Sequence, residues 1–76
     1  MLEKNQVNKY DADHDVLHVF LGNQYNASAE EEFPGVYVSR DDDTEEIVGF
    51  TVIDYRKNRH LLHEHYPQYD FTVSVA

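Results

Sequence analysis

The chain has 76 residues, enough for a single domain, 1–76, whose small core supports about a few kcal/mol of net stability. Its 15 Asp and Glu outnumber its 6 Lys and Arg, and the net charge of −9 excludes the dense basic surface that nucleic acids and anionic membranes require. The chain has no cysteine and no long apolar run, so we expect an acidic, cytoplasmic protein without disulfides, thiolate zinc sites or membrane spans.

In the first half, alternating apolar and polar residues predict strands. Gln6–Tyr10 is weakly patterned and fits an edge strand, and Asp11–Asp15 predicts a turn of residues that bond their own backbone. Val16–Leu21 is the clearest strand. Ser28–Phe33 predicts a second, polar edge strand, because its glutamates discourage edge-to-edge aggregation.

The Pro34-Gly35 pair predicts a tight turn in the second half, since proline fixes φ and glycine permits positive φ. The strand Val36–Asp41 follows, and an acidic loop leads to a strand at Ile47–Tyr55. Apolar residues occupy both faces of this last strand, which predicts a central position or a covered second face. Gly49 within it predicts a bulge or the close approach of another group.

Near the C-terminus, Asn58 predicts the N-cap of a short helix over Arg59–His65, which Pro67 ends. Alternation over Phe71–Val75 predicts a final strand, paired within the chain or with a second copy. We therefore expect an α+β, mostly β fold: an antiparallel β-meander of four to six strands with one short helix.

The alternation also divides the strand residues between two faces. The predicted inner residues are Leu17, Val19, Leu21, Val36, Val38, Val48, Phe50 and Val52. The predicted outer residues are Val16, His18, Phe20, Tyr37, Ile47, Thr51 and Ile53.

Several of these segments together resemble one known family. The strand Asp15–Leu21 after Tyr10-Asp11, the run Glu31–Val36 and the strand Ile47–Asp54 are similar to the small prokaryotic domain of unknown function 2283. The resemblance covers roughly Tyr10 to Asp54 and implies a compact antiparallel meander with a short helix, with no established activity. The chain departs from that pattern in its more polar first segment, in its longer acidic turn without glycine, and in His18, where an aromatic is common.

Histidines and acidic residues are the candidate chemical groups. His60 and His63 have the i, i+3 spacing that places two imidazoles on one helix face, where a divalent metal or small ligand can bind. His18 has no nucleophile evidently paired with it, so a structural role is favoured over a general base. Asp41–Glu46 lacks the glycine of an EF-hand calcium loop, and the default interpretation is a solvated turn.

We therefore expect a protein-association module, not an enzyme, that needs no cofactor. A sheet with apolar residues on both faces must be covered by its helix, by a second copy or by a partner, and a homodimer is the commonest solution. The acidic surface favours a basic protein partner, as in an antitoxin-like role. The predicted partner-facing residues are Phe20, Tyr37, Ile47, Ile53, Glu31 and Glu32. The alternative is a metal- or ligand-binding domain that uses His60 and His63.

Overall fold

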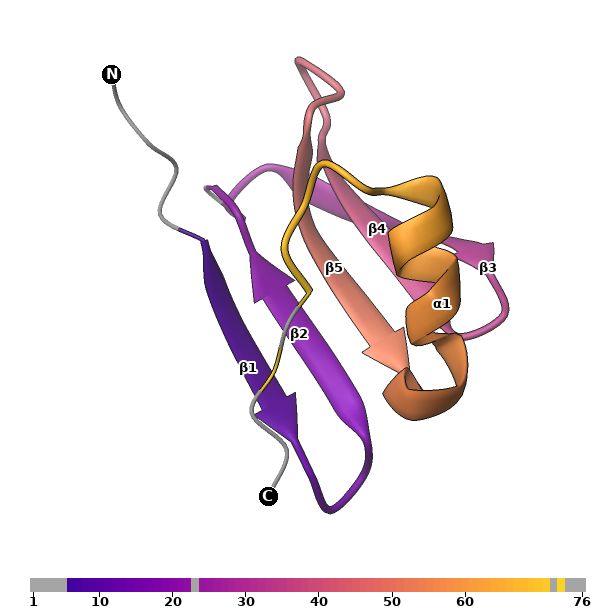
Figure 1. Cartoon of the computed structure of the whole chain (residues 1–76). Helices are drawn as coiled ribbons and strands as arrows, with labels where there is room; N and C mark the ends of the chain where they lie inside the picture. The colour runs from indigo at the N-terminus through magenta and orange to yellow at the C-terminus, as the bar shows by residue number, and fades with distance from the viewer. Residues whose placement is uncertain (1–5, 23, 72, 74–76) are drawn as a thin grey trace.

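The computed structural model describes residues 6–22, 24–71 and 73. In chain order the elements are β1 (Val7–Asp11), β2 (Val16–Phe20), β3 (Ala27–Phe33), β4 (Val36–Asp41), β5 (Ile47–Ile53) and α1 (Tyr55–His65). The strands form one antiparallel sheet in the order β1-β2-β5-β4-β3, and α1 packs across one of its faces (Figure 1). The predicted mostly β, antiparallel α+β fold with one short helix is confirmed. In the described part of the chain, no helix has the length and hydropathy needed to cross a membrane.

The positions of the strands in the sheet follow their composition. The two polar strands, β1 and β3, are the edges, and β5, with apolar residues on both faces, is the centre. β5 ends at Ile53 and not at Tyr55, because Asp54 adopts a left-handed conformation (φ 55°) that turns the chain into α1.

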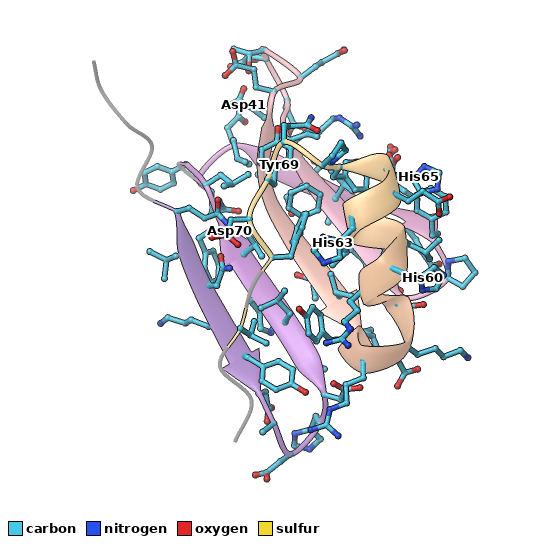
Figure 2. The ribbon with its side chains drawn as sticks, in the orientation of Figure 1. Asp41, His60, His63, His65, Tyr69 and Asp70 are labelled. Carbon is cyan, nitrogen blue, oxygen red and sulfur yellow. The ribbon has the colours of Figure 1, made fainter. Side chains whose placement is uncertain are left out.

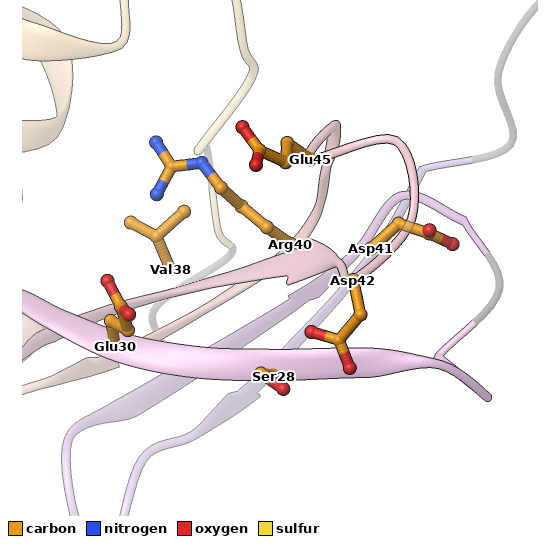
Figure 3. Close-up of a pocket in the computed structure, with 7 residues that line it drawn as sticks. All are labelled: Ser28, Glu30, Val38, Arg40, Asp41, Asp42 and Glu45. Atoms are coloured by element: carbon orange, nitrogen blue, oxygen red, sulfur yellow. The ribbon is translucent and has the colours of Figure 1, made fainter.

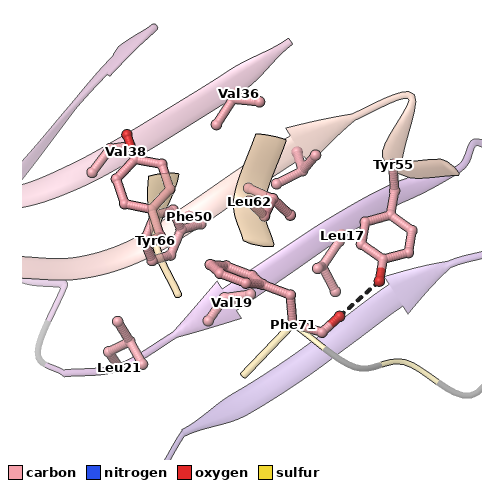
Figure 4. Packing of buried hydrophobic residues seen from close by; sticks show 11 residues of the cluster. Leu17, Val19, Leu21, Val36, Val38, Phe50, Tyr55, Leu62, Tyr66 and Phe71 are labelled. Carbon is pink, nitrogen blue, oxygen red and sulfur yellow. Dashed lines mark hydrogen bonds between the residues drawn. The ribbon is translucent and has the colours of Figure 1, made fainter. Parts of the chain in front are cut away.

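The core lies between α1 and the face of the sheet that it covers, which we call the helix face (Figure 4). Leu62, Tyr55 and Tyr66 reach into it from α1 and its end, and the Phe50 ring packs edge-on against Tyr66 and Phe71 at centroid distances of 5.1 and 5.0 Å. Seven of the predicted inner residues belong to this core cluster: Leu17, Val19, Leu21, Val36, Val38, Phe50 and Val52.

Two β-bulges interrupt the alternation. In β5 the register with β4 steps from Ser39–Gly49 to Arg40–Ile47, which leaves Val48 as an extra residue. In β3 the register steps in the same way past Glu32. A bulge shifts all later side chains by one position, so residues beyond it change face. The bulge that Gly49 predicted is present next to it, at Val48. Another strand also approaches Gly49 closely: a Cβ on Gly49 would lie 2.8 Å from the Val19 carbonyl oxygen.

The predicted final strand is wrong for the residues that are described. Phe71 and Val73 lie outside any strand, and residues 72, 74 and 75 lie outside the described residues. Phe71 is instead a core residue, and its carbonyl oxygen accepts a 2.7 Å hydrogen bond from the Tyr55 hydroxyl (Figure 4). The segment is held by side chains in place of a strand ladder.

The predicted start of the helix is also wrong, because the cap comes from a distant turn. α1 begins at Tyr55, and the Asp54 side chain makes no cap bond. Asp15, in the β1–β2 turn, replaces it: its carbonyl oxygen accepts from Tyr55 N at 2.9 Å, and its carboxylate accepts from Arg56 N at 3.2 Å. The carboxylate also accepts from the Tyr10 hydroxyl at 2.5 Å, and this bond, with burial, raises the pKa of Tyr10.

Asn58, the predicted N-cap, is instead buried inside α1. Its side-chain amide donates to the carbonyl oxygens of Ile53 at 2.8 Å and Pro34 at 3.3 Å. Gly35 has φ 86°, as the Pro-Gly pair predicted, and its carbonyl oxygen accepts from Ile53 N at 2.7 Å. The amide therefore joins the β3–β4 turn, the end of β5 and the helix.

Replacing Asp15 by alanine removes the side-chain part of this cap, and we expect the free energy of unfolding to fall by about 1–3 kcal/mol. Asp15 has φ 57°, and Asp15→Asn keeps one acceptor oxygen and tolerates this left-handed backbone better than alanine does, so it loses less. Urea unfolding followed by circular dichroism measures both. Asp13→Ala, in the same turn, is the matched control, and an equal loss in that variant contradicts the cap.

Replacing Gly35 by alanine forces a Cβ into a left-handed residue, 2.8 Å from Asn58 Nδ2 and 3.0 Å from the Ile53 carbonyl oxygen. We expect thermal and urea unfolding to show a loss of about 2 kcal/mol or more. At Gly22 a new Cβ meets nothing closer than 3.4 Å, so Gly22→Ala is the matched control and should be well tolerated. Equal losses in the two variants contradict this account of the turn.

Candidate functional site

The sheet face opposite α1, which we call the open face, has no helix or strand packed over it among the described residues. The strand pairings place on it Val7, Lys9, Asp11, Val16, His18, Phe20, Ala27, Ala29, Glu31, Tyr37, Ser39, Asp41, Gly49, Thr51 and Ile53. The side chain of Gln24 lies over one end of it, where a Cβ on Gly49 would be 3.3 Å from Gln24 Oε1.

Charge is absent from the centre of the open face. The three inner strands, β2, β5 and β4, present Val, His, Phe, Gly, Thr, Ile, Tyr and Ser there, although 28% of the chain is Asp, Glu, Lys or Arg. Charged side chains on this face lie at its margins: Lys9, Asp11 and Glu31 on the edge strands, and Asp41 at the end of β4. At the far end of β4, the Asp41 carboxylate is bound to the N–H groups of its own turn, Asp43 and Thr44.

Phe20, Tyr37 and Ile53 lie on the open face, as predicted. Phe20 and Ile53 are 37% and 40% exposed, and the His18 ring stacks beside Phe20 with the planes 15° apart. Sequence reasoning missed Val7, which is 45% exposed and lies opposite Phe20. The available signal was the alternation of Val7 with Lys9, in a segment whose overall pattern is weak.

Ile47 does not join them. The bulge at Val48 pairs Ile47 with Arg40, and Ile47 packs against the core on the helix face. Its predicted outward orientation is therefore wrong, because simple alternation takes no account of an inserted residue.

Glu31 and Glu32 are separated in the same way. Glu31 lies opposite Tyr37 on the open face, and its carboxylate accepts from Gly35 N at 3.0 Å. Glu32 is the bulged residue and turns to the helix side, where it accepts from Arg40 Nη1 at 2.9 Å and from the Tyr66 hydroxyl at 3.3 Å. The Arg40 bond lowers the pKa of Glu32, while burial and then Glu32 raise the pKa of Tyr66.

The helix histidines do not form a cluster. His60 Nδ1 lies 3.0 Å from the Lys57 carbonyl oxygen, and the His65 ring packs against Phe33. Figure 2 shows His60, His63 and His65 spread along α1. Among the described residues no three His, Asp or Glu side chains are placed to hold a metal ion. Metal binding through His60 and His63 therefore stays a prediction without a third ligand.

A polar hollow of about 540 Å³ lies beside the acidic β4–β5 loop (Figure 3). It is lined by Ser28, Glu30, Val38, Arg40, Asp41, Asp42 and Glu45. The lining contains one serine and no histidine or cysteine, so it assembles no nucleophile with a nitrogen base.

Comparisons of the chain with protein-family models, with curated proteins and with solved structures found no significant match. The resemblance to the domain of unknown function 2283 therefore stays a prediction.

The Glu32–Arg40 pair makes stability depend on pH in a defined direction. Arg40 lowers the pKa of Glu32 in the folded chain below the ordinary value of 4.5, so the pair stabilises the fold above that pH. This contribution is lost as the pH falls through the lowered folded pKa. Because the pair is partly exposed, we expect Glu32→Gln to reduce the free energy of unfolding at pH 7 by only about 0.5 kcal/mol.

Urea unfolding between about pH 7 and pH 3 tests this, since the difference between the variant and the natural chain should shrink toward the acid end. Glu46→Gln, in the exposed β4–β5 connection, is the control and should show no such trend. A constant difference across the pH range contradicts the role of the carboxylate.

Proposed function

We propose that this chain is a protein-association module that binds a second copy of itself through the open face. The observation that carries the proposal is the uncharged, partly apolar centre of that face in an otherwise highly charged chain. Solvated surfaces of acidic proteins carry charge, whereas the centres of protein interfaces are depleted of it. Phe20 and Ile53 supply the apolar contacts.

The size of the open face agrees with a modest dimer. Five strands about 4.8 Å apart, each about 17–20 Å long, give a footprint of about 400–500 Å². Two copies face to face would bury about 1,000 Å², the lower end for specific interfaces, so we expect a dissociation constant on the order of micromolar.

A second copy fits this face better than a basic partner does. A basic protein would be attracted to carboxylates, and these lie on the edge strands and in the acidic Asp41–Glu46 segment. The antitoxin-like role predicts binding there and not at the open face. The two occupants differ in salt dependence, because two copies of charge −9 repel one another, whereas opposite charges attract.

Sedimentation velocity between about 1 and 200 μM should show a concentration-dependent dimer that tightens as NaCl rises from 50 to 500 mM. Phe20→Asp and Ile53→Asp place a charge in the uncharged centre, so each should weaken the dimer at least tenfold while circular dichroism and melting stay close to those of the natural chain. Tyr25→Asp is the control: Tyr25 is 91% exposed in the β2–β3 connection, away from the sheet.

A monomer at every concentration and salt level would refute the proposal. A dimer that Phe20→Asp and Ile53→Asp leave intact would place the interface elsewhere. Association with a basic protein that weakens with salt and leaves Phe20 and Ile53 dispensable would instead favour the antitoxin-like role.

A further inference from the structure

One titratable group lies in the uncharged centre of the open face. His18 is on β2, next to the central strand, and its Nδ1 lies 3.4 Å from the Thr51 hydroxyl of β5. The other four histidines lie elsewhere: His14 in the β1–β2 turn and His60, His63 and His65 on α1, which covers the opposite face. Histidine is the side chain whose charge ordinarily changes between about pH 5 and 8.

The described residues directly around His18 include no carboxylate that could balance a positive charge. Directly opposite it on β1 is Lys9, and its neighbours on β2 are Val16 and Phe20. On β5 it faces Thr51, and beyond that strand lies Tyr37 of β4. These neighbours supply one cation, a hydroxyl, a phenol and two apolar groups.

Asp11, the nearest carboxylate on this face, is already engaged. It lies beside Val16 at the end of β1, and it accepts from the backbone N–H groups of Asp13 and His14. The His14 ring lies 2.9 Å from its second oxygen. Among the described residues of its own chain, a protonated His18 would thus have no uncommitted carboxylate beside it, and it would lie next to the positive charge of Lys9.

We propose that His18 is a pH gate for self-association: the dimer forms with neutral imidazoles and dissociates when His18 is protonated. This inference rests on the proposed dimer through the open face. Burying an unpaired cation is unfavourable, so protons that bind the imidazole in the monomer shift the equilibrium away from the dimer.

The net charge of the protein predicts the opposite trend, which makes the test decisive. The isoelectric point is about 4.7, so acidification from pH 7.5 to 5.5 reduces the repulsion between two copies and by itself tightens a dimer. Weakening over this range therefore requires a local group that opposes the general effect. Among the described residues of the open face, His18 is the histidine available for that role.

The experiment is sedimentation equilibrium of the full chain at pH 7.5 and 5.5, at constant ionic strength. We expect the dissociation constant to rise at least tenfold at pH 5.5. In His18→Gln the ratio of the two constants should fall to one or below, and this ratio, not the absolute affinity, is the measured quantity. His18→Asn provides a second uncharged replacement if the first variant fails to fold. His63→Gln, on α1, is the matched control and should keep the full response.

An unchanged or tighter dimer of the natural chain at pH 5.5 overturns the gate and leaves the proposed dimer in place. The same is true if His18→Gln weakens with acid as much as the natural chain. A monomer at both pH values overturns the gate and the proposed function together.

Discussion

The contact between Asp15 and the first turn of α1 is the interaction on which the rest of the architecture depends. A helix of eleven residues is marginal in isolation and needs its terminal N–H groups satisfied. Here a residue forty positions upstream of Tyr55 supplies both a carbonyl and a carboxylate, so the first hairpin and the helix fix one another. Once α1 is fixed, Leu62 and Tyr66 cover the inner strands, and Tyr55 anchors the carbonyl of Phe71. The uncovered state of the opposite sheet face is a consequence of this single-sided arrangement.

Much of the sheet could be predicted from the sequence because strand alternation is a local property. The pattern Leu17, Val19, Leu21 and the pair Val36 and Val38 identified the helix face, and the two-sided apolar strand β5 is at the centre. The helix start could not be found locally, because Asp54 resembles an ordinary loop residue and the cap lies on another hairpin. The strand order was also inaccessible: β5 pairs with β2, three connections back along the chain, and no short-range pattern encodes that choice.

The candidate site was predicted only in part, for the same physical reason. Phe20, Tyr37 and Ile53 follow the period of two and lie where alternation places them. Ile47 and Glu32 do not. Ile47 lies next to the bulge in β5 and Glu32 is the bulged residue of β3, and a bulge moves side chains to the other face. Gly49 was a usable signal for the first bulge, whereas the stretch of three consecutive glutamates gave none for the second. The lack of charge across β2, β5 and β4 became visible only when the register was known.

The bulge and glutamates of β3 also limit the stoichiometry of any assembly. Sheets that join through their edges grow without end, and filaments are the usual outcome. On β3, consecutive acidic side chains and a local irregularity disfavour such lateral addition. A contact through the flat side of the sheet behaves differently, since a two-fold pairing consumes the only such side on each molecule and leaves no template for a third. An edge that is poorly suited to strand addition would therefore keep the proposed dimer from growing into a filament.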